Sequence, residues 1–567
     1  MIKRIDENNV MSEAIKQHRN GFFKKAKDLY RAILTQNPRN ADAIFRLGTM
    51  ALQFQQYDKA VSYINQAIIL SPKISSMYIN LGAAYIQLNQ HEEAILAYDK
   101  ALNLDPNNPN AYFNKGRALQ TLDRPLKTNQ NSSSCTTWRL LQITGARECY
   151  KRAIEINSKE PDTWVNLGVV EHELGDHISA LNAFEMAARI DPECAAAYAN
   201  SAAVLFDKGL HEISQILMDK AISLQPDNVD YKYRLSLFML SSERLEKGWK
   251  YFDTRFEAEE KAKAALRAVP PEYWKGGSLK NKKLLLWTEQ GLGEELLGLG
   301  ILSDLINTGA SIHLQCSKRM LPIVKENFPT LNVSSWGKHR QTVDQELPPF
   351  VFQCQALSAM KYLYSNTDAI RRDQPYIVAD PVLANEYRQR YIEKARGKKI
   401  IGISWRSGNQ KIGEAKSIPI EAWKPILETK GVLFVNLQYG DCTEDIKNIK
   451  NRLGVDIFVD KEIDPLGNLA PVFAQIAATD LVLSVSNSNI HIAGSMGVSA
   501  WSIIPASKGR LWFWFTERTD SPWYPSVKLF RQTSSVGAHK EWWSEPVDAI
   551  ASSLSKWLNS RAKEPSP

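Results

Sequence analysis

Five prolines set the most restrictive pattern in this chain of 567 residues. Pro38, Pro72 and Pro106 follow one another at intervals of 34 residues, and Pro192 and Pro226 are again 34 residues apart. The remaining interval, from Pro106 to Pro192, is 86 residues, which equals two repeats and 18 further residues. A fixed period of this length is typical of solenoids, in which each unit packs mainly on its neighbours. The first half of the chain is therefore predicted to be a superhelical ribbon.

The same chemistry recurs at matching positions within the repeats. In the unit 75–108 the small residues include Gly82 and Ala94, and the large ones are Tyr78 and Tyr98. The unit 161–194 repeats the pattern with Trp164, Leu167, Gly168, Ala180, Phe184, Ala187 and Pro192. Small residues let two antiparallel helices approach, large ones fill the space toward the next pair, and proline ends the second helix. This pattern resembles that of tetratricopeptide repeats.

Six such units are expected between about residues 7 and 228, followed by an atypical helical pair that ends near residue 257. The 18 surplus residues fall near 124–145, in a polar segment rich in Ser, Thr and Asn. That composition favours a surface loop, and an error in the gene model is the alternative. Arrays of this kind mostly bind proteins or peptides in their groove. The alternatives are that the array supports its own neighbouring domain or self-associates.

The composition excludes several classes of protein. The formal net charge is +8, and basic residues are mixed with acidic ones, so we expect no nucleic-acid partner. The six cysteines have no C-x-x-C spacing, which predicts neither a zinc site nor a disulfide framework. No apolar segment is typical of a secretion signal or long enough for a transmembrane helix. A cytoplasmic location is therefore expected.

From Lys282 onward the pattern changes to short β-rich runs that alternate with helical segments. The runs cover residues 282–287, 311–316, 350–354, 398–405, 432–440, 456–460, 481–486 and 499–505. Alternation at this spacing predicts parallel sheets with right-handed crossovers.

The predicted domains follow from these two patterns. We expect a repeat superhelix at 1–257, a linker at 258–280, a Rossmann-like half at 281–375, a connector at 376–398, a second Rossmann-like half at 399–533, and a closing helix and tail at 534–567. The closing helix, at about 541–560, is expected to brace the first half. The predicted fold class is thus an α-α superhelix followed by an α/β domain pair.

The stretch LVLSVSNSNIHIAGSMG, at 481–497, is the most informative part of the second half. An apolar strand ends at Val485 and leads through Ser486, Asn487 and Ser488 into a helix. Ligands of open parallel sheets bind beyond the carboxyl ends of the strands. The exposed N–H groups and the dipole of a helix N-terminus favour an anion such as a diphosphate. A turn with a purely structural role remains the alternative.

Several stretches of the second half resemble the GT-B glycosyltransferases of the heptosyltransferase type. They are WTEQGLGEELLGLGIL (287–302), GISWRSGNQKIGEAKSIPIEAW (402–423), NLQYGD (436–441), SVSNSNIHIAGSMGVSAWSIIP (484–505) and DSPWYPSVKLFRQ (520–532). The layout with preceding repeats is also similar to that of protein O-GlcNAc transferases. The resemblance implies a GT-B fold of two Rossmann-like domains, a nucleotide-diphospho-sugar donor, and no metal or other cofactor.

On the acceptor side, the resemblance places the catalytic base just after the glycine-rich loop that follows the first strand. The family usually has Asp there, whereas this chain has Glu294, and Glu295 is a second candidate. A glutamate can still transfer a proton if it lies about 3 Å from the acceptor hydroxyl, but a misplacement of about 1 Å is costly. The alternative is that both carboxylates only cap the following helix.

On the donor side, the resemblance assigns Lys416 to the diphosphate, with Arg406 as a possible helper. It also matches His491 to the histidine that follows the family's donor loop, where Ser486 replaces a usual Asp. The complete set of predicted donor-binding residues is Arg406, Lys416, Gln438, Asp441, Ser486, Asn487, Ser488, Asn489, His491 and Gly494. Gln438 and Asp441 are assigned to the base or ribose, and Gly494 to close packing of the helix on the sheet.

Two interpretations of the whole chain remain open from sequence. The first is an inverting, metal-independent glycosyltransferase whose repeats present a protein or glycan acceptor. The second is a protein-binding scaffold with an inactive transferase domain, which the replacements at Glu294 and Ser486 favour. A protein that self-assembles through its repeats is a weaker third. The aromatic residues Trp512, Trp514, Trp523 and Tyr524 are expected to pack between domains rather than stack on a sugar.

Overall fold

The computed structural model describes residues 6–122, 132–258, 272–289, 291–336, 350–370, 374–409, 412–506, 509–533 and 543–561, and of 132–138 and 560–561 it describes the backbone alone. The chain divides between Val204 and Leu205 into two compact units. We call them the repeat unit and the sheet unit. This division does not coincide with the boundary after residue 257 that the repeat pattern predicts, because the last helices pack with the sheets.

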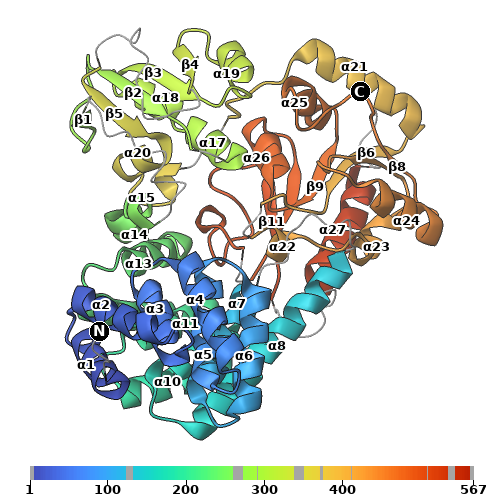
Figure 1. The fold of residues 1–567 in the computed structure, drawn as a ribbon. Helices are drawn as coiled ribbons and strands as arrows, with labels where there is room; N and C mark the ends of the chain where they lie inside the picture. Colours follow the sequence, from blue (N-terminus) through green and yellow to red (C-terminus); the bar gives the residue numbers. More distant parts are fainter. Residues whose placement is uncertain are drawn as a thin grey trace. The chain divides into compact units, whose positions relative to one another are not determined.

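The repeat unit consists of antiparallel helix pairs in which each helix packs on the next (Figure 1). Its helices are α1 (Glu7–Arg19), α2 (Phe23–Gln36), α3 (Ala41–Gln53), α4 (Tyr57–Leu70), α5 (Ser75–Gln87), α6 (His91–Leu104), α7 (Pro109–Thr121), α8 (Ser132–Ile156), α9 (Pro161–Glu173), α10 (His177–Ile190) and most of α11 (Ala195–Asp207). The last turn of α11, from Leu205 to Asp207, belongs to the sheet unit. The side-chain amides of Asn40 and Asn108 cap α3 and α7 by accepting hydrogen bonds from the N–H groups of Ala43 (3.0 Å) and Ala111 (3.2 Å).

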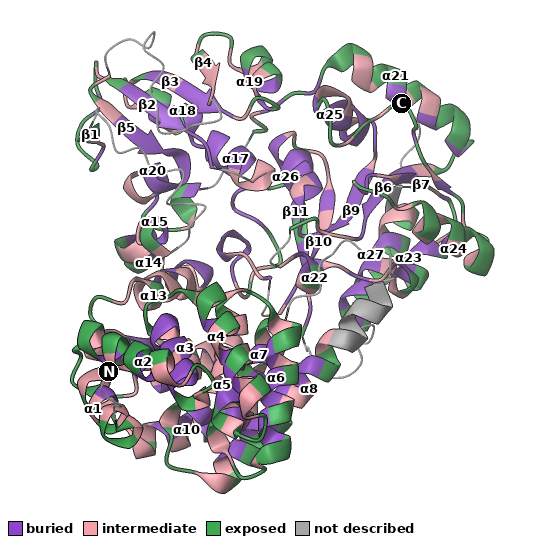
Figure 2. Cartoon of the chain, viewed as in Figure 1, coloured by how far each residue is buried: buried purple, intermediate pink, exposed green. Residues whose placement is uncertain are grey.

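The recurring spacing of glycine and aromatic residues has a direct steric basis. A β-carbon built on Gly82 would lie 2.6 Å from Cε1 of Tyr98, and one on Gly116 would lie 2.8 Å from Cε1 of Tyr150. Both tyrosines are buried, and Figure 2 shows that the buried residues of this unit face the inside of the helix pairs. The helices can therefore pack this closely only where no side chain separates them.

The surface loop expected at 124–145 is wrong for the part of it that the structure describes. Helix α8 begins at Ser132, so residues 132–145 extend a repeat helix at its amino end. The extension packs on its neighbours, because Ile143 is buried and the Arg139 guanidinium donates to the carbonyl of Gln120 (2.8 Å). Residues 124–131 of the expected loop lie outside the described residues.

The sheet unit begins with helices and continues with two parallel sheets. The helices are α12 (His211–Leu224), α13 (Val229–Ser241), α14 (Leu245–Phe252) and α15 (Arg255–Ala258). The first sheet has the order β1-β5-β2-β3-β4, from β1 (Glu272–Tyr273), β2 (Lys283–Trp287), β3 (Ser311–Cys316), β4 (Asn332–Ser335) and β5 (Phe352–Gln355). Every described ladder in it is parallel.

The second sheet is also parallel in all its described ladders, with the order β11-β10-β9-β6-β7-β8. Its strands are β6 (Lys399–Ser404), β7 (Val432–Asn436), β8 (Ile457–Phe458), β9 (Leu481–Val485), β10 (Ala500–Ile504) and β11 (Val527–Arg531). Every β-rich run of the sequence overlaps one of the strands of the two sheets. The short edge strands β1 and β4, and β11, were not predicted.

Helices connect and cover the strands of both sheets (Figure 1). They are α17 (Leu292–Leu299), α18 (Leu302–Asn307), α19 (Leu321–Asn327), α20 (Ala356–Leu363), α21 (Pro381–Ala395), α22 (Gly413–Lys416), α23 (Lys424–Leu427), α24 (Thr443–Leu453), α25 (Ala470–Ala477), α26 (Ser488–Ser495) and α27 (Ser544–Arg561), with 3₁₀ turns at Asp368–Ile370, Ile420–Trp423 and Trp512–Trp514.

The closing helix α27 packs on the second sheet, so the prediction that it braces the first half is wrong. Its buried residues Val547, Ile550 and Leu554 share a cluster with Trp423 and Phe530. Burial of this apolar face against its nearest sheet explains the position of α27.

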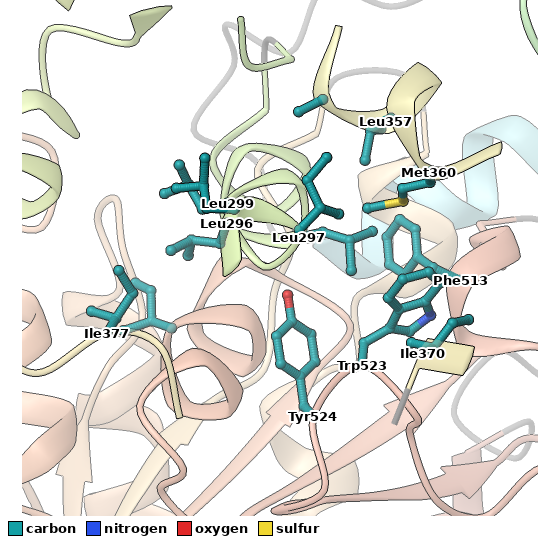
Figure 3. Packing of buried hydrophobic residues seen from close by; sticks show 14 of the residues in the cluster. Leu296, Leu297, Leu299, Leu357, Met360, Ile370, Ile377, Phe513, Trp523 and Tyr524 are labelled. Carbon is teal, nitrogen blue, oxygen red and sulfur yellow. The ribbon is translucent and has the colours of Figure 1, made fainter. Parts of the chain in front are cut away.

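The main core of the sheet unit runs without a break between the two sheets. It joins residues of the first sheet, such as Leu286, to residues of the second, such as Val482, and includes Trp249 of α14. Figure 3 shows part of it, where side chains of α17 and α20 meet Phe513, Trp523 and Tyr524. The aromatic residues Trp512, Trp514, Trp523 and Tyr524 are all buried in this core. They pack between the two sheets, as the sequence predicts.

Candidate functional site

A cavity of about 330 Å³ lies between the two sheets. Its walls follow the carboxyl ends of three strands: Gly291 to Glu294 after β2, Ser407 to Asn409 after β6, and Ser486 to Asn489 after β9. In the second sheet β6 lies between β7 and β9, so the chain order reverses between β6 and β9. Open parallel sheets bind ligands at this kind of reversal, because the loops diverge there and leave a crevice.

The turn after β9 is held rigidly by Asn487, the N-cap of α26. Its Oδ1 accepts from the N–H of Asn489 (3.0 Å), and its Nδ2 donates to Ser404 Oγ (2.8 Å) and to the carbonyl of Arg406 (3.1 Å). The side chain thus ties the loop after β6 to the loop after β9. What it presents to the cavity is the first turn of a helix, with half-buried Ser488 at its start.

The Ser486 side chain is engaged in a hydrogen bond, because its Oγ accepts from Nε1 of Trp514 (2.9 Å). Asn489 likewise uses its Nδ2 to bind the carbonyl of Leu437 (2.9 Å). These two residues line the cavity, but their side chains fix the loop.

Lys416 is a buried cation in the cavity wall, with 5% of its surface exposed. It ends the short helix α22, and a β-carbon on Gly509 would lie 2.7 Å from its Cγ, so Gly509 lets the chain pass closely over it. Burial lowers the pKa of Lys416 from 10.5 to about 8, although the nearby Glu294 carboxylate acts in the opposite direction. An anion in the cavity would stabilise the charged form of this side chain.

His491 is part of the cavity wall and is almost fully buried. Its Nδ1 is 2.9 Å from the hydroxyl of Tyr524, and burial, with a smaller effect of Lys416, lowers its pKa to about 3. A β-carbon on Gly293 would lie 2.7 Å from its Cδ2, so the glycine-rich loop can pass this close only without a side chain. His491 is therefore a neutral ring that shapes the cavity wall.

Two adjacent carboxylates of α17 have different environments. Glu294 is half-buried and lines the cavity. Glu295 does not line it; its Oε1 accepts from Thr288 Oγ1 (2.7 Å) and from the N–H of Ser317 (2.6 Å). These two bonds join the ends of β2 and β3, so Glu295 holds the sheet edge while Glu294 faces the ligand space.

Four of the predicted donor residues are not among those that line the cavity. Arg406 pairs with Asp445 (3.2 Å) and donates to the carbonyl of Asp441 (2.6 Å). Gln438 is buried, and its Oε1 accepts from Ser404 Oγ and from the N–H groups of Trp405 and Arg406. Its role is to close the loop after β6.

Asp441 and Gly494 are the other two. Asp441 is exposed and accepts from the N–H of Thr443 (3.0 Å), which together with the Thr443 side chain lowers its pKa. Gly494 packs under the ring of Tyr524, where a β-carbon would overlap it. Gly494 is predicted to let its helix lie close to the sheet, and α26 does contact β9 and β10, while the nearest side chain to Gly494 itself is that of Tyr524.

The structure adds cavity residues that the sequence did not indicate. Arg319 donates to the carbonyls of Pro465 (3.1 Å) and Gly467 (3.3 Å), and Tyr439 accepts from the N–H of Gly408 (2.7 Å). Phe513 is a third. Arg319 is the third residue after β3, and its place at a strand end of the first sheet was the signal that could have drawn attention to it. The charged residues that line the cavity, within the described ranges, are Glu294, Arg319 and Lys416.

Neither a metal site nor a membrane span is found in the part of the chain that the structure describes. No group of three or more His, Cys, Asp or Glu residues is placed there to hold a metal ion. No described helix combines the length and the apolar character that crossing a bilayer requires.

Comparison with known families accounts for the repeat unit. Residues 82–123 match the family described as "TPR repeat", and residues 14–73 and 136–195 match "Tetratricopeptide repeat". The N-terminal region consists of tetratricopeptide repeats. Such repeats serve protein interaction.

One of two curated relatives matches this chain beyond its repeats. Protein FlbA of Caulobacter vibrioides is 28% identical over 446 residues, which cover 75% of this chain and 72% of the relative. The small glutamine-rich tetratricopeptide repeat-containing protein 2 of Mycosarcoma maydis is 30% identical over 83 residues, or 15% of this chain and 24% of that protein. The first match therefore includes part of the sheet unit, and the second spans a short segment.

Among solved structures, MamA is 21% identical, with a TM-score of 0.28, and the match covers 34% of this chain and 94% of MamA. A thermophilic TPR protein of Thermus thermophilus is 17% identical, with a TM-score of 0.29, and the match covers 35% of this chain and 99% of that one.

Proposed function

We propose that the protein is a glycosyltransferase of the GT-B type that transfers a sugar from a nucleotide-diphospho-sugar to a protein or glycan acceptor. The observation that carries the proposal is the cavity, which brings the N-terminal turn of α26, the buried Lys416 and the carboxylate of Glu294 together between two parallel sheets. It is flanked by the strand ends at which such sheets bind nucleotides.

The donor side of the cavity is assigned from its positive charge. A diphosphate carries negative charge that a helix N-terminus and a buried ammonium both stabilise. Lys416 has a pKa of about 8 without a ligand, so it is mostly protonated near neutral pH. When the bond from the sugar to the diphosphate breaks, the nucleoside diphosphate leaves with the electron pair. Lys416 is positioned to stabilise that developing charge.

The acceptor side is assigned to Glu294. In the proposed reaction its carboxylate takes the proton of the acceptor hydroxyl, and the hydroxyl oxygen forms the new bond to the anomeric carbon from the face opposite the departing diphosphate. That displacement inverts the configuration of the sugar. Glu294 suits this role because it faces the cavity and is half-buried, whereas Glu295 is held by Thr288 and Ser317.

The repeats are proposed to bring the acceptor to the cavity. Tetratricopeptide arrays bind proteins or peptides, and a transferase in the same chain would act on what they hold. The match with Protein FlbA includes parts of both the repeat unit and the sheet unit, because 446 aligned residues exceed the length of either unit.

The test combines nucleotide binding with turnover. Calorimetric titration of the full chain with UDP-, GDP- and ADP-sugars identifies the base, and a CMP-linked sugar, which has one phosphate, tests the need for a diphosphate. Lys416→Ala is expected to weaken binding at least tenfold. Glu294→Gln is expected to keep binding and to reduce transfer or donor hydrolysis at least a hundredfold.

Matched controls come from exposed residues of the same types. Lys424→Ala and Glu326→Gln change side chains outside the cavity and should leave binding and turnover unchanged. If no nucleotide sugar binds at millimolar concentration, the proposed donor is wrong. If Glu295→Gln abolishes turnover of the folded protein while Glu294→Gln does not, the assignment of the base is wrong.

A protein-binding scaffold without catalytic activity is the second candidate. It is favoured by the placement of Arg406, Gln438 and Asp441 outside the cavity lining and by Glu294 at a position where the resembling enzymes have Asp. Nucleotide binding without turnover in the experiment above would support an inactive transferase domain of this kind.

A further inference from the structure

A segment with a buried middle, residues 512–515, links the cavity to the first helices of the sheet unit. We call residues 509–518 the strap. The Arg510 guanidinium pairs with Asp207 at the end of α11 (3.2 Å) and lies 5.0 Å from the ring centre of Phe206. Phe206 stacks in turn on Phe238 of α13, with ring centres 4.2 Å apart. One end of the strap is thus fixed to helices rather than to a sheet.

The other end of the strap is fixed to the same helices. Arg518 pairs with Glu243 just after α13 (3.0 Å), and Thr516 Oγ1 donates to the carbonyl of Ser241 (3.3 Å). Both ends therefore depend on the region between the end of α11 and α14.

The middle of the strap is backbone held in a strained conformation. Phe515 has φ 58° and ψ −177°, a region that is populated almost exclusively by glycine, and its side chain is fully buried. Arg531 of β11 donates to the carbonyls of Trp514 (2.6 Å), Phe515 (3.1 Å) and Arg518 (2.7 Å). A residue in this conformation persists only when its surroundings over-determine it.

The acidic anchors compensate two partly buried arginines, Arg510 and Arg531, that repel each other. Burial first, and the neighbouring Arg510 second, lower the pKa of Arg531 to about 10, while Glu243 acts in the opposite direction. Burial also lowers the pKa of Arg510, and Asp207 opposes this effect. Removal of Asp207 would leave Arg510 and Arg531 with less compensating negative charge in a region of low dielectric.

The strap forms part of the cavity wall on its other face. Leu511 and Phe513 line the cavity, and Gly509 packs against Lys416. The Phe513 ring centre is 5.2 Å from that of His491, and Trp514 Nε1 donates to Ser486 Oγ (2.9 Å). A shift of the strap would therefore move two parts of the cavity lining together: Lys416 and the turn before α26.

We propose that Arg510 and Asp207 are positioning residues for the cavity, which they act on through the strap. The pair lies outside the cavity lining, and the strap carries its effect to Lys416 and to the turn at Ser486. This makes the helices between residues 205 and 252 part of the machinery that shapes the binding site. The proposal concerns the shape of the cavity; only the nucleotide arm of its test rests on the proposed function.

Hydrogen exchange of the full-length protein, without ligand, tests the proposal. Asp207→Asn removes the charge at constant size and is expected to speed exchange at least tenfold in peptides from 486–495 and 509–518. Peptides from β2 and β3 should stay within twofold of the wild type. Asp207→Glu, which keeps the charge, should restore most of the protection. Glu243→Gln tests the second anchor and is expected to affect the same peptides.

The matched control is Asp99→Asn, which removes the ion pair with Lys115 (2.5 Å) in the repeat unit and should leave the cavity peptides unchanged. The proposal is overturned if exchange at 486–495 and 509–518 stays within twofold in Asp207→Asn, or rises equally in β2 and β3. In a nucleotide titration, Asp207→Asn should raise the Kd at least fivefold. Absence of binding by the wild type would contradict the proposed function, and the exchange data would still decide on the strap.

Discussion

Substitution of Lys416 by methionine is expected to stabilise the protein while it weakens ligand binding. In the wild type, the folded state must hold a protonated lysine in a wall where it is 5% exposed. Its pKa falls from 10.5 to about 8 on folding, mainly through burial. A pKa difference of about 2.5 corresponds to about 3 kcal/mol that opposes folding at neutral pH. Methionine has a similar length and no charge, so it removes this opposition.

The sign of the effect determines its pH dependence. Below pH 8 the lysine is protonated in both the folded and the unfolded state, so the gain of Lys416→Met is constant at about 3 kcal/mol. Between pH 8 and 10.5 the unfolded state binds more protons than the folded one, and wild-type stability rises. The difference between the two proteins should therefore shrink by about 1.4 kcal/mol per pH unit in this window.

Tryptophan fluorescence during urea unfolding measures this difference in stability for the sheet unit, which contains Lys416. Trp138 and Trp164 precede residue 205, and the other tryptophans of the fifteen follow it, so the signal reports mainly on the sheet unit. The control is Lys424→Met, which alters an exposed lysine and should change stability by less than about 0.5 kcal/mol. The reasoning fails if Lys416→Met destabilises the protein at pH 7, or if the difference does not change between pH 8 and 10.

Three further outcomes follow from individual contacts. The depressed pKa of His491, about 3, means that the unfolded state takes up this proton first as pH falls below 6.5. The sheet unit should lose several kcal/mol between pH 6.5 and 4, with a flatter profile for His491→Gln in acid titrations followed by fluorescence. Gly293→Ala would place a β-carbon 2.7 Å from His491 Cδ2. It should lower the stability by about 1–3 kcal/mol and should also lower the nucleotide affinity. The control Gly277→Ala, where a β-carbon meets open space, should change neither quantity in the same assays. Gly82→Ala would press on Tyr98 and should lower the thermal midpoint seen by circular dichroism without moving the tryptophan transition; a shift of both would contradict the division into two units.

Local chemistry explains why much of the fold follows from the sequence. The proline and glycine spacing of the repeats reflects contacts within one pair of helices, such as Gly82 against Tyr98, and these contacts recur with the period of the chain. The strands of the second half are short apolar runs, and alternation with helices is enough to predict parallel sheets. The short strands β1 and β4 escape this logic because two to four residues carry no periodicity.

The extension of α8 shows the limit of composition as a guide. Residues 132–145 are polar on average, which favours a loop, yet Ile143 buries its side chain in the repeat core. Tertiary packing of a few residues outweighed the propensity of the rest.

The sequence by itself determined the repeat period, the alternation of strands and helices in the second half, and the turns after β2, β6 and β9 that line the cavity. Only the tertiary structure decided which side chains face it. Glu294 and Glu295 are adjacent, but successive residues of a helix point about 100° apart, so one lines the cavity and the other binds Ser317. In the same way Lys416 enters the wall while Arg406 turns toward Asp445. Side-chain direction and the attachment of the strap to the end of α11 depend on contacts between residues that are distant in the chain, and a local pattern does not encode them.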